Sequence, residues 1–129
     1  MNIRLLDGLP FVSAVVGFGG RYLILDNVLL DTGSAGSIFS ADRLAEIDLS
    51  YAPEDELLRI RGVGGVEFVF TKLVDHLAIG ELRVNDFRIE VGAMDYGFPI
   101  DAILGMDFLI AVGAIIDLDQ MEVIAAAQL

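Results

Sequence analysis

The chain of 129 residues has no cysteine and no tryptophan, and it has only one histidine and one lysine. Without cysteine it can form neither a disulfide framework nor a reactive thiolate. The single histidine, His76, excludes a three-histidine zinc site and would have to serve any Ser-His-Asp triad. Basic residues are also scarce, with 8 Lys and Arg against 20 Asp and Glu and a net charge of −12. Because such a chain repels phosphates and anionic lipids, we expect neither nucleic acid nor a membrane as a partner.

Long hydrophobic runs are missing too, although 55% of the residues are hydrophobic. A membrane-spanning helix needs about 20 apolar residues, whereas the longest uncharged stretch late in the chain covers only residues 108–116. An uncharged run at residues 8–20 is faintly similar to a signal peptide, but Asp7 precedes it and its valines and glycines favour a buried strand. We therefore expect a cytoplasmic protein with a single domain over residues 1–129, since domains most often have about 100–150 residues.

Glycine, with 14 residues against only 3 prolines, separates short runs rich in valine, isoleucine, leucine and phenylalanine. This pattern is typical of an all-β domain with short connections. The predicted strands cover residues 11–18, 21–26, 28–30, 57–61, 66–79, 81–91, 114–118 and 122–126. Turns are expected at residues 26–27, 79–81 and 119–120. Two short helices are predicted, one at residues 41–47 with Ser40 as its N-cap and one beginning near Gly105.

The first motif with chemical content is the sequence Val-Leu-Leu-Asp-Thr-Gly-Ser at residues 28–34. An apolar run leads directly into Asp31, and Thr32, Gly33 and Ser34 follow it. Gly33 allows a sharp turn and leaves the carboxylate uncrowded, while Ser34 and nearby amides can hold the carboxylate by hydrogen bonds. A strand that simply ends in an Asx-turn fits these four residues equally well, so the motif alone does not decide.

Two further glycine motifs follow along the chain. The first comprises Gly62, Val63, Gly64 and Gly65 between two β-like runs. Neither Gly-Lys-Ser/Thr nor a complete G-x-G-x-x-G motif follows, so a phosphate-binding loop is rejected in favour of a hairpin tip or an ordinary loop. The second is Ala-Ile-Leu-Gly-Met-Asp-Phe-Leu at residues 102–109, where apolar residues and a glycine lead into a helix. Alone it is weak, because such junctions are common.

The order of these three motifs resembles the retropepsin-like aspartic proteases, over residues 11–124. The resemblance is closest to the cellular and bacterial single-domain members, including the protease domain of the DNA-damage-inducible ubiquitin-shuttle proteins. In those proteins the helix after the glycine also reads Gly-Met-Asp-x-Leu, as residues 105–109 do here. The resemblance implies a small closed acid-protease barrel with one or two short helices and with its active site at the two-fold axis of a homodimer.

The resemblance also implies roles for individual residues of the catalytic turn. Asp31 matches the catalytic aspartate, and Thr32 matches the residue that hydrogen-bonds across the dimer axis. Gly33 and Ser34 complete the turn. Met106 is a departure, because retroviral members carry there an arginine that braces the dimer, so a retroviral-style interface is not implied.

Other positions match the parts of the family that bind substrate. Gly62, Val63, Gly64 and Gly65 match the tip of the flap that closes over an extended peptide. Ile103 belongs to the apolar-apolar-Gly motif, which packs under the catalytic loop. The family uses no metal or other cofactor, and apolar pocket walls suggest hydrophobic side chains on both sides of the cut bond.

The chemistry leads to a homodimer by a separate argument. Aspartyl hydrolysis needs two carboxylates that share one proton, so that one acts as base and the other as acid. The chain has one Asp-Thr-Gly, so a catalytic protein has to pair Asp31 with Asp31 of a second copy. We thus predict an aspartic endopeptidase with water as the nucleophile. The alternatives are a non-catalytic dimeric peptide-binding or assembly module on the same fold, and a monomeric structural domain.

The remaining polar residues are assigned structural roles. His76 is expected on the surface or on a sheet face rather than as a base, since no nucleophile is evident near it. Asp101, Asp107 and Asp117 are expected to be solvated or to cap helices. The acidic cluster Pro-Glu-Asp-Glu at residues 53–56 is predicted to form an exposed loop. The apolar run at residues 121–126 is predicted to form part of the dimer interface.

Overall fold

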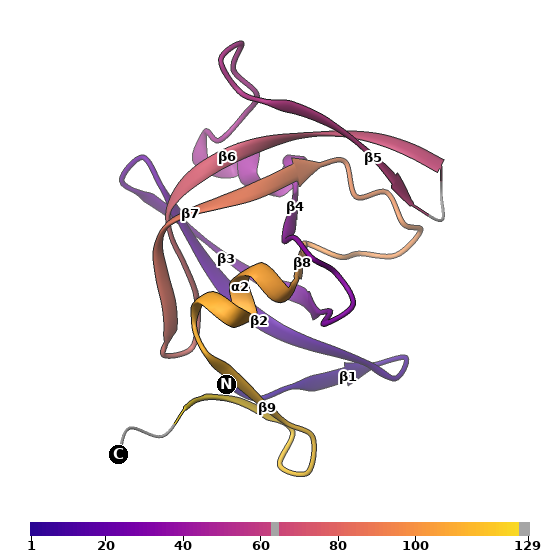
Figure 1. Cartoon of the computed structure of the whole chain (residues 1–129), viewed down its shortest axis with the longest axis vertical. Helices are drawn as coiled ribbons and strands as arrows, with labels where there is room; N and C mark the ends of the chain where they lie inside the picture. Colours follow the sequence, from indigo (N-terminus) through magenta and orange to yellow (C-terminus); the bar gives the residue numbers. More distant parts are fainter. Residues whose placement is uncertain (63–64, 127–129) are drawn as a thin grey trace.

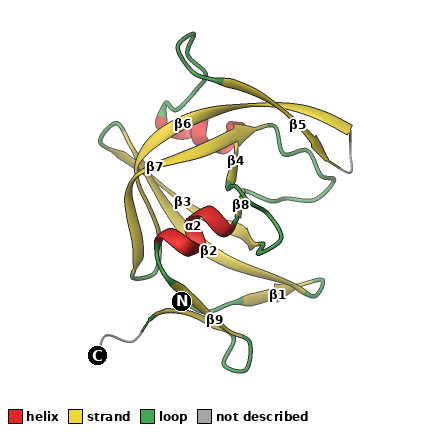
Figure 2. Ribbon diagram, viewed as in Figure 1, coloured by secondary structure: helices red, strands yellow, loops and turns green. Residues whose placement is uncertain are grey.

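The computed structural model describes residues 1–62 and 65–126, so the predictions on Val63 and Gly64 lie outside the described residues. Figure 1 and Figure 2 show a protein made mostly of strands, with only short helical segments. None of the described helices is long and apolar enough to cross a membrane. The elements are β1 (Arg4–Leu6), β2 (Leu9–Phe18), β3 (Arg21–Leu30), β4 (Ile38–Ser40), α1 (Ala41–Leu44), the 3₁₀ helix η1 (Ala45–Ile47), β5 (Leu57–Gly62), β6 (Gly65–Ile79), β7 (Leu82–Gly92), β8 (Ala102–Leu104), α2 (Met106–Ala111), β9 (Ala114–Asp117) and β10 (Glu122–Ala125).

Eight of the strands form one sheet in the order β1-β2-β3-β8-β4-β7-β6-β5, and β2 also pairs with β6. This additional pairing joins the two sides of the sheet, so the strands from β2 to β6 form a closed ring (Figure 1). The all-β class with two short helices is therefore confirmed, with the strands arranged as a ring. The ring closes where Gly17 of β2 lies opposite His76 of β6. The His76 ring fills the space that a side chain at Gly17 would need, which confirms the sheet-face position predicted for this histidine.

The turn predicted at residues 26–27 is wrong, because β3 continues through Asp26 and Asn27 to Leu30. Asp101, from a distant part of the chain, satisfies the backbone of Asn27 on both sides. Its carboxylate accepts a hydrogen bond from the Asn27 amide at 3.1 Å, and its own amide donates to the Asn27 carbonyl at 2.8 Å. The pair forms a β-bulge within β3, since Asp26 and Asn27 together lie opposite the single residue Ser13 of β2. The turns predicted at residues 79–81 and 119–120 are confirmed.

Asp101 also corrects a second expectation, since it is not solvated. Only 7% of it is exposed, and it forms an ion pair with Arg43 at 2.9 Å. Asp117, by contrast, caps the turn between β9 and β10 by accepting from the amides of Asp119 and Gln120. The acidic loop at residues 53–56 is exposed except for Asp55, whose carboxylate is 2.7 Å from Lys72. Lys72, and next the amide of Ala52, hold the pKa of Asp55 below its usual range.

Both predicted helices are present. The first consists of α1 and η1 together, and the Ser40 hydroxyl accepts a hydrogen bond from the Arg43 amide, as expected of an N-cap. The second is α2, which begins directly after Gly105. The strands β1, β4 and β8 were not predicted as strands, because three residues are too few to show an alternating pattern.

The interior contains two separate apolar clusters. The large core lies inside the ring and is packed against α2; its bulkiest fully buried members are Phe39 and Phe108. The second group, named here the small cluster, is made of Phe11, Ile38, Val69, Met94 and Ile100. Four partly buried residues pack against the small cluster: Leu29, Leu58, Ile60 and Ile103.

The two ends of the chain lie together at the foot of the molecule (Figure 1). Strands β9 and β10 form an antiparallel pair. On the other side of β10, the N-terminal residues add a third strand-like segment, with hydrogen bonds between Met1 and Val123 and between Ile3 and Met121. Strand β10 is therefore flanked on both sides within its own chain.

Candidate active site

The catalytic turn predicted from the sequence begins where β3 ends. The Asp31 amide donates to the carbonyl of Leu104 in β8 at 3.0 Å, so two neighbouring strands fix its position. The carboxylate Oδ1 accepts from the Gly33 amide at 2.9 Å, and the Ser34 amide donates to the Asp31 carbonyl at 3.2 Å. Asp31 is half-buried, while Thr32 and Gly33 are exposed. The turn thus presents a carboxylate that is held on one side and open on the other.

The first turn of α2 is hydrogen-bonded to the loop that follows Asp31. The amide of Met106 donates to the Ser34 carbonyl at 2.8 Å, and the Ser34 hydroxyl donates to the Gly36 carbonyl at 2.8 Å. Gly105 lies so close that a side chain there would overlap the carbonyl oxygens of Ser34 and Gly36. The glycine of the apolar-apolar-Gly motif is therefore required by close approach of two backbone segments.

Ile103 lies in β8, beside the strand that leads into Asp31, and a role for it in substrate binding stays a prediction. It pairs with Leu29 of β3 in parallel register and with Ile38 of β4 in antiparallel register. Its side chain is partly buried and packs against the small cluster, as do those of Leu58 and Ile60 from β5. The small cluster therefore connects the strands beside Asp31 with the β5–β6 hairpin.

The hairpin predicted around the glycine-rich tip is present, with β5 and β6 antiparallel and Gly62 paired with Gly65. Val63 and Gly64, at the tip itself, lie outside the described residues. Figure 1 shows the hairpin at the opposite side of the molecule from β1 and β9. The structure gives the hairpin a strand pairing and an apolar connection to the catalytic strand; a flap role for its tip stays a prediction.

A polar network under the catalytic turn was not predicted. Ser37 is 1% exposed, and its hydroxyl donates to Asp107 at 2.7 Å and accepts from the Gly105 amide at 3.0 Å. Asp107 was expected to be solvated or to cap a helix. It lies in the first turn of α2, but its carboxylate points to Ser37. Nothing in the sequence distinguishes Ser37 from the other serines of this segment, because its role depends on a residue 70 positions away.

A second carboxylate lies next to the same loop. The carboxylate of Glu90, on β7, is the group that a side chain at Gly36 would meet. Burial, and next the negative charge of Asp107, raise the pKa of Glu90 above its ordinary value. Within residues 1–62 and 65–126, no group of three or more His, Asp or Glu side chains is placed to hold a metal ion.

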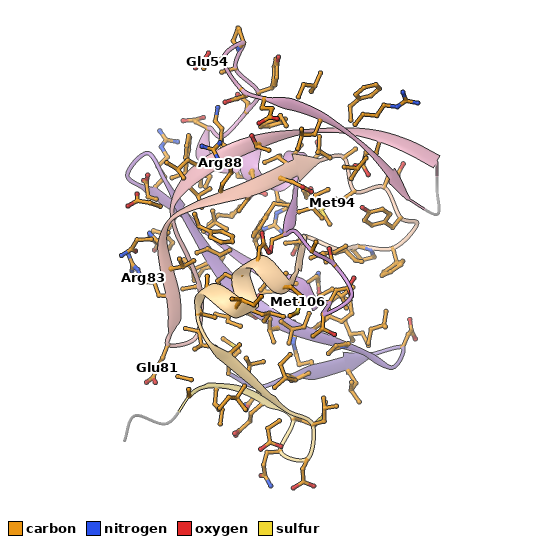
Figure 3. The ribbon with its side chains drawn as sticks, in the orientation of Figure 1. Glu54, Glu81, Arg83, Arg88, Met94 and Met106 are labelled. Atoms are coloured by element: carbon orange, nitrogen blue, oxygen red, sulfur yellow. The ribbon has the colours of Figure 1, made fainter. Side chains whose placement is uncertain are left out.

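A cavity of about 430 Å³ opens beside β1 and β3. Phe11 belongs both to its lining and to the small cluster, which places the cavity next to the apolar residues described above. In Figure 3 the reader can find the small cluster by its member Met94, which follows β7, and the start of α2 by Met106. The cavity lining is mostly apolar and consists of Leu6, Asp7, Leu9, Phe11, Asn27, Phe98 and Pro99.

Comparison with known proteins gives the same family as the motifs. The sequence model of a family described as "Aspartyl protease" matches residues 14–108, which is well over half of the chain and includes the catalytic turn. No curated protein matches the chain. Among solved structures, the chain is similar to a retropepsin-like aspartic protease from Rickettsia conorii, with a TM-score of 0.67, 17% identity and 95% of each chain covered. The identity is low, so this similarity shows the fold. The chain belongs to the aspartyl protease family and has the fold of a retropepsin-like, single-domain member.

Proposed function

We propose that the protein is an aspartic endopeptidase whose catalytic dyad consists of Asp31 from each of two identical subunits. The observation that carries this proposal is the geometry of the single Asp-Thr-Gly turn, which holds one oxygen of Asp31 and leaves the carboxylate half-exposed. A second carboxylate is needed for the chemistry, and the chain has no second turn of this sequence. The exposed position of Thr32 leaves its side chain free to meet its counterpart across the axis.

The reaction follows from one proton shared between two carboxylates. The ionised Asp31 takes a proton from water as the water oxygen attacks the peptide carbonyl carbon. The protonated partner's Asp31 donates its proton to the carbonyl oxygen, which gives a neutral tetrahedral intermediate. The proton gained from water then passes from Asp31 to the leaving amine nitrogen, while one hydroxyl of the intermediate returns a proton to the partner's Asp31. The C–N bond breaks to yield a carboxylic acid and an amine, and the dyad again holds one proton.

The residues around the turn favour an extended peptide with hydrophobic side chains. Leu29 and Ile103 offer apolar, partly buried walls beside Asp31, and Leu58 and Ile60 offer the same from the β5–β6 hairpin. The cavity beside β1 and β3 adds a further apolar recess. In this proposal the hairpin tip, with Gly62, Val63, Gly64 and Gly65, closes over the substrate and pairs with its backbone as an added strand would.

The dimer contact proposed from the sequence is refined by the terminal strands. Strand β10, within the predicted run at residues 121–126, has neighbours on both sides in its own chain. Strand β9 pairs only with β10 within the described chain. Exposed apolar side chains lie on both strands, including Ile115 at 44% and Ile124 at 39%. We propose that β9 meets the second copy with its outer edge.

The direct test is cleavage of a mixed peptide library by the purified protein, with Asp31→Asn as control. Wild type should cleave peptides and sediment as a dimer. Its pH–rate profile should be bell-shaped with an optimum on the acid side of neutrality, because the active dyad holds one proton. Asp31→Asn should lose at least about 1,000-fold in kcat, since it removes both the base and the shared proton. It should remain dimeric, because the two facing side chains no longer repel each other.

Two results would contradict the proposal. Undiminished cleavage by Asp31→Asn would exclude the aspartyl mechanism. A dimer that binds peptides but cleaves none of them between acid and neutral pH would favour a peptide-binding module on the same fold.

A further inference from the structure

We propose that Asp107 is a positioning residue that holds the catalytic turn in place through Ser37. The proposal rests on the proposed function, because positioning matters to the reaction only if Asp31 is catalytic. Asp107 touches neither Asp31 nor a substrate. It acts on the loop that connects Asp31 with β4.

The contacts of the Asp107 carboxylate carry the inference. One oxygen accepts from the Ser37 hydroxyl at 2.7 Å and from the Phe108 amide at 2.7 Å. The other accepts from the Ser37 amide at 3.2 Å. Both polar groups of Ser37 that can donate are therefore bound by one carboxylate, and Ser37 is 1% exposed, so water does not replace these bonds.

Ser37 passes this hold on to the turn. Its hydroxyl also accepts from the Gly105 amide at 3.0 Å, which fixes the start of α2 against the loop. From that start, the amides of Met106 and Asp107 donate to the carbonyls of Ser34 and Ala35 at 2.8 and 3.2 Å. The loop is thus bound at Ser34, Ala35 and Ser37 by consecutive residues of one helix. Loosening Ser37 removes the last of these attachments and lets the turn shift relative to β8.

An ordinary structural role makes a different prediction. An acidic residue in the first turn of a helix interacts favourably with the helix dipole wherever it lies. Asp42 occupies the same place in α1, where it is exposed. Asp42→Asn therefore removes the same charge from the same helix position without touching the catalytic loop. It is the matched control for Asp107→Asn.

The experiment compares Asp107→Asn, Ser37→Ala, their double variant and Asp42→Asn in the full chain. Asparagine keeps the size of the side chain, but its NH₂ group faces one of the N–H or O–H donors and cannot accept from it. Asp107→Asn and Ser37→Ala should each lower kcat about 10- to 100-fold, since a small misplacement costs this much. KM should change less than about twofold, because no contact with substrate is removed. The double variant should lose no more kcat than the less active of the two single variants, because the two residues act as one unit.

Amide hydrogen exchange provides a readout that needs no substrate. The amides of Met106 and Asp107 should exchange faster in Asp107→Asn and in Ser37→Ala, and at the wild-type rate in Asp42→Asn. If wild type cleaves no peptide but this pattern appears, the proposed function fails and the hold on the turn is supported. If wild type is active and kcat of Asp107→Asn is unchanged, the inference is overturned.

Three further results also decide it. Additive losses in the double variant would mean that Asp107 does not act through Ser37, which overturns the inference. An equal loss of kcat in Asp42→Asn would overturn it as well, because the loss would then reflect helix charge. If Asp107→Asn does not fold, Ser37→Ala decides: faster exchange with lower kcat supports the inference, and wild-type values for both overturn it.

Discussion

The large core and the small cluster are both apolar, but they differ in what surrounds them. Phe39 and Phe108 of the large core are fully buried. The small cluster is bordered by Leu58 and Ile60 of the β5–β6 hairpin and by Ile103 of β8, and all three are only partly buried. Partly buried apolar residues border the large core too, including Phe70 and Ile116, and the five members of the small cluster are themselves buried. What distinguishes the small cluster is its place between the β5–β6 hairpin and the strand that leads into Asp31. Under the proposed function, stability and substrate contact then fall to different residues of one sheet.

The largest expected effect is on stability and comes from the large core. Phe108 has no exposed surface and packs edge-to-face on Phe87, with ring centroids 6.0 Å apart. Phe108→Ala should lower the free energy of unfolding by about 3–5 kcal/mol, because it leaves a cavity that the surrounding strands cannot close. Chemical unfolding followed by circular dichroism measures this loss. A loss below about 1 kcal/mol would mean that this core is not closely packed.

The next effect is on catalysis and comes from a residue packed against the small cluster. Ile103→Ala should lower kcat/KM for peptides with hydrophobic side chains at the cut at least about 10-fold, because it removes an apolar wall beside Asp31. Ile89→Ala is the matched control, since Ile89 is the same residue type in the large core and is 1% exposed. It should destabilise by about 2–5 kcal/mol and leave kcat/KM of the folded protein unchanged. Equal kinetic losses in the two variants would remove the distinction between the clusters.

The smallest effect is on the pH dependence of stability and comes from Glu90, whose pKa is raised by burial and by Asp107. Such a group favours folding while it is protonated, and this contribution is lost as pH rises through its folded-state pKa. Glu90→Gln cannot ionise, so it should match wild type below about pH 4. At neutral pH it should be more stable by no more than about 1 kcal/mol, because solvent screens the partly exposed group.

Unfolding curves of both proteins at acid and neutral pH test this expectation. A Glu90→Gln protein that is less stable than wild type at neutral pH would contradict it. In that case favourable contacts of the ionised Glu90 would outweigh the cost of burying its charge beside Asp107.

The sequence predicts those features that depend on neighbouring residues. Asp31 after an apolar run, the hairpin between residues 57 and 70 and the Ser40 cap were all recognisable, because a strand end, a hairpin and a helix start each have a local pattern. The Asn27–Asp101 and Ser37–Asp107 contacts were not, since each joins residues about 70 positions apart. Asp26-Asn27 has the composition of a turn, and only the folded chain shows that the pair forms a bulge inside β3, hydrogen-bonded to Asp101.

The closure of the ring has a consequence for the order of events during synthesis. Gly17 of β2 pairs with His76 of β6, and about 60 residues of chain separate them. At a synthesis rate of about 5–20 residues per second, the edge of β2 that pairs with β6 stays unpaired for about 3–12 seconds until β6 leaves the ribosome. Chains rich in such distant pairings also fold slowly, within milliseconds to seconds. During that interval β2 has an open backbone edge, so the nascent chain passes through a period in which it can pair with the wrong strand.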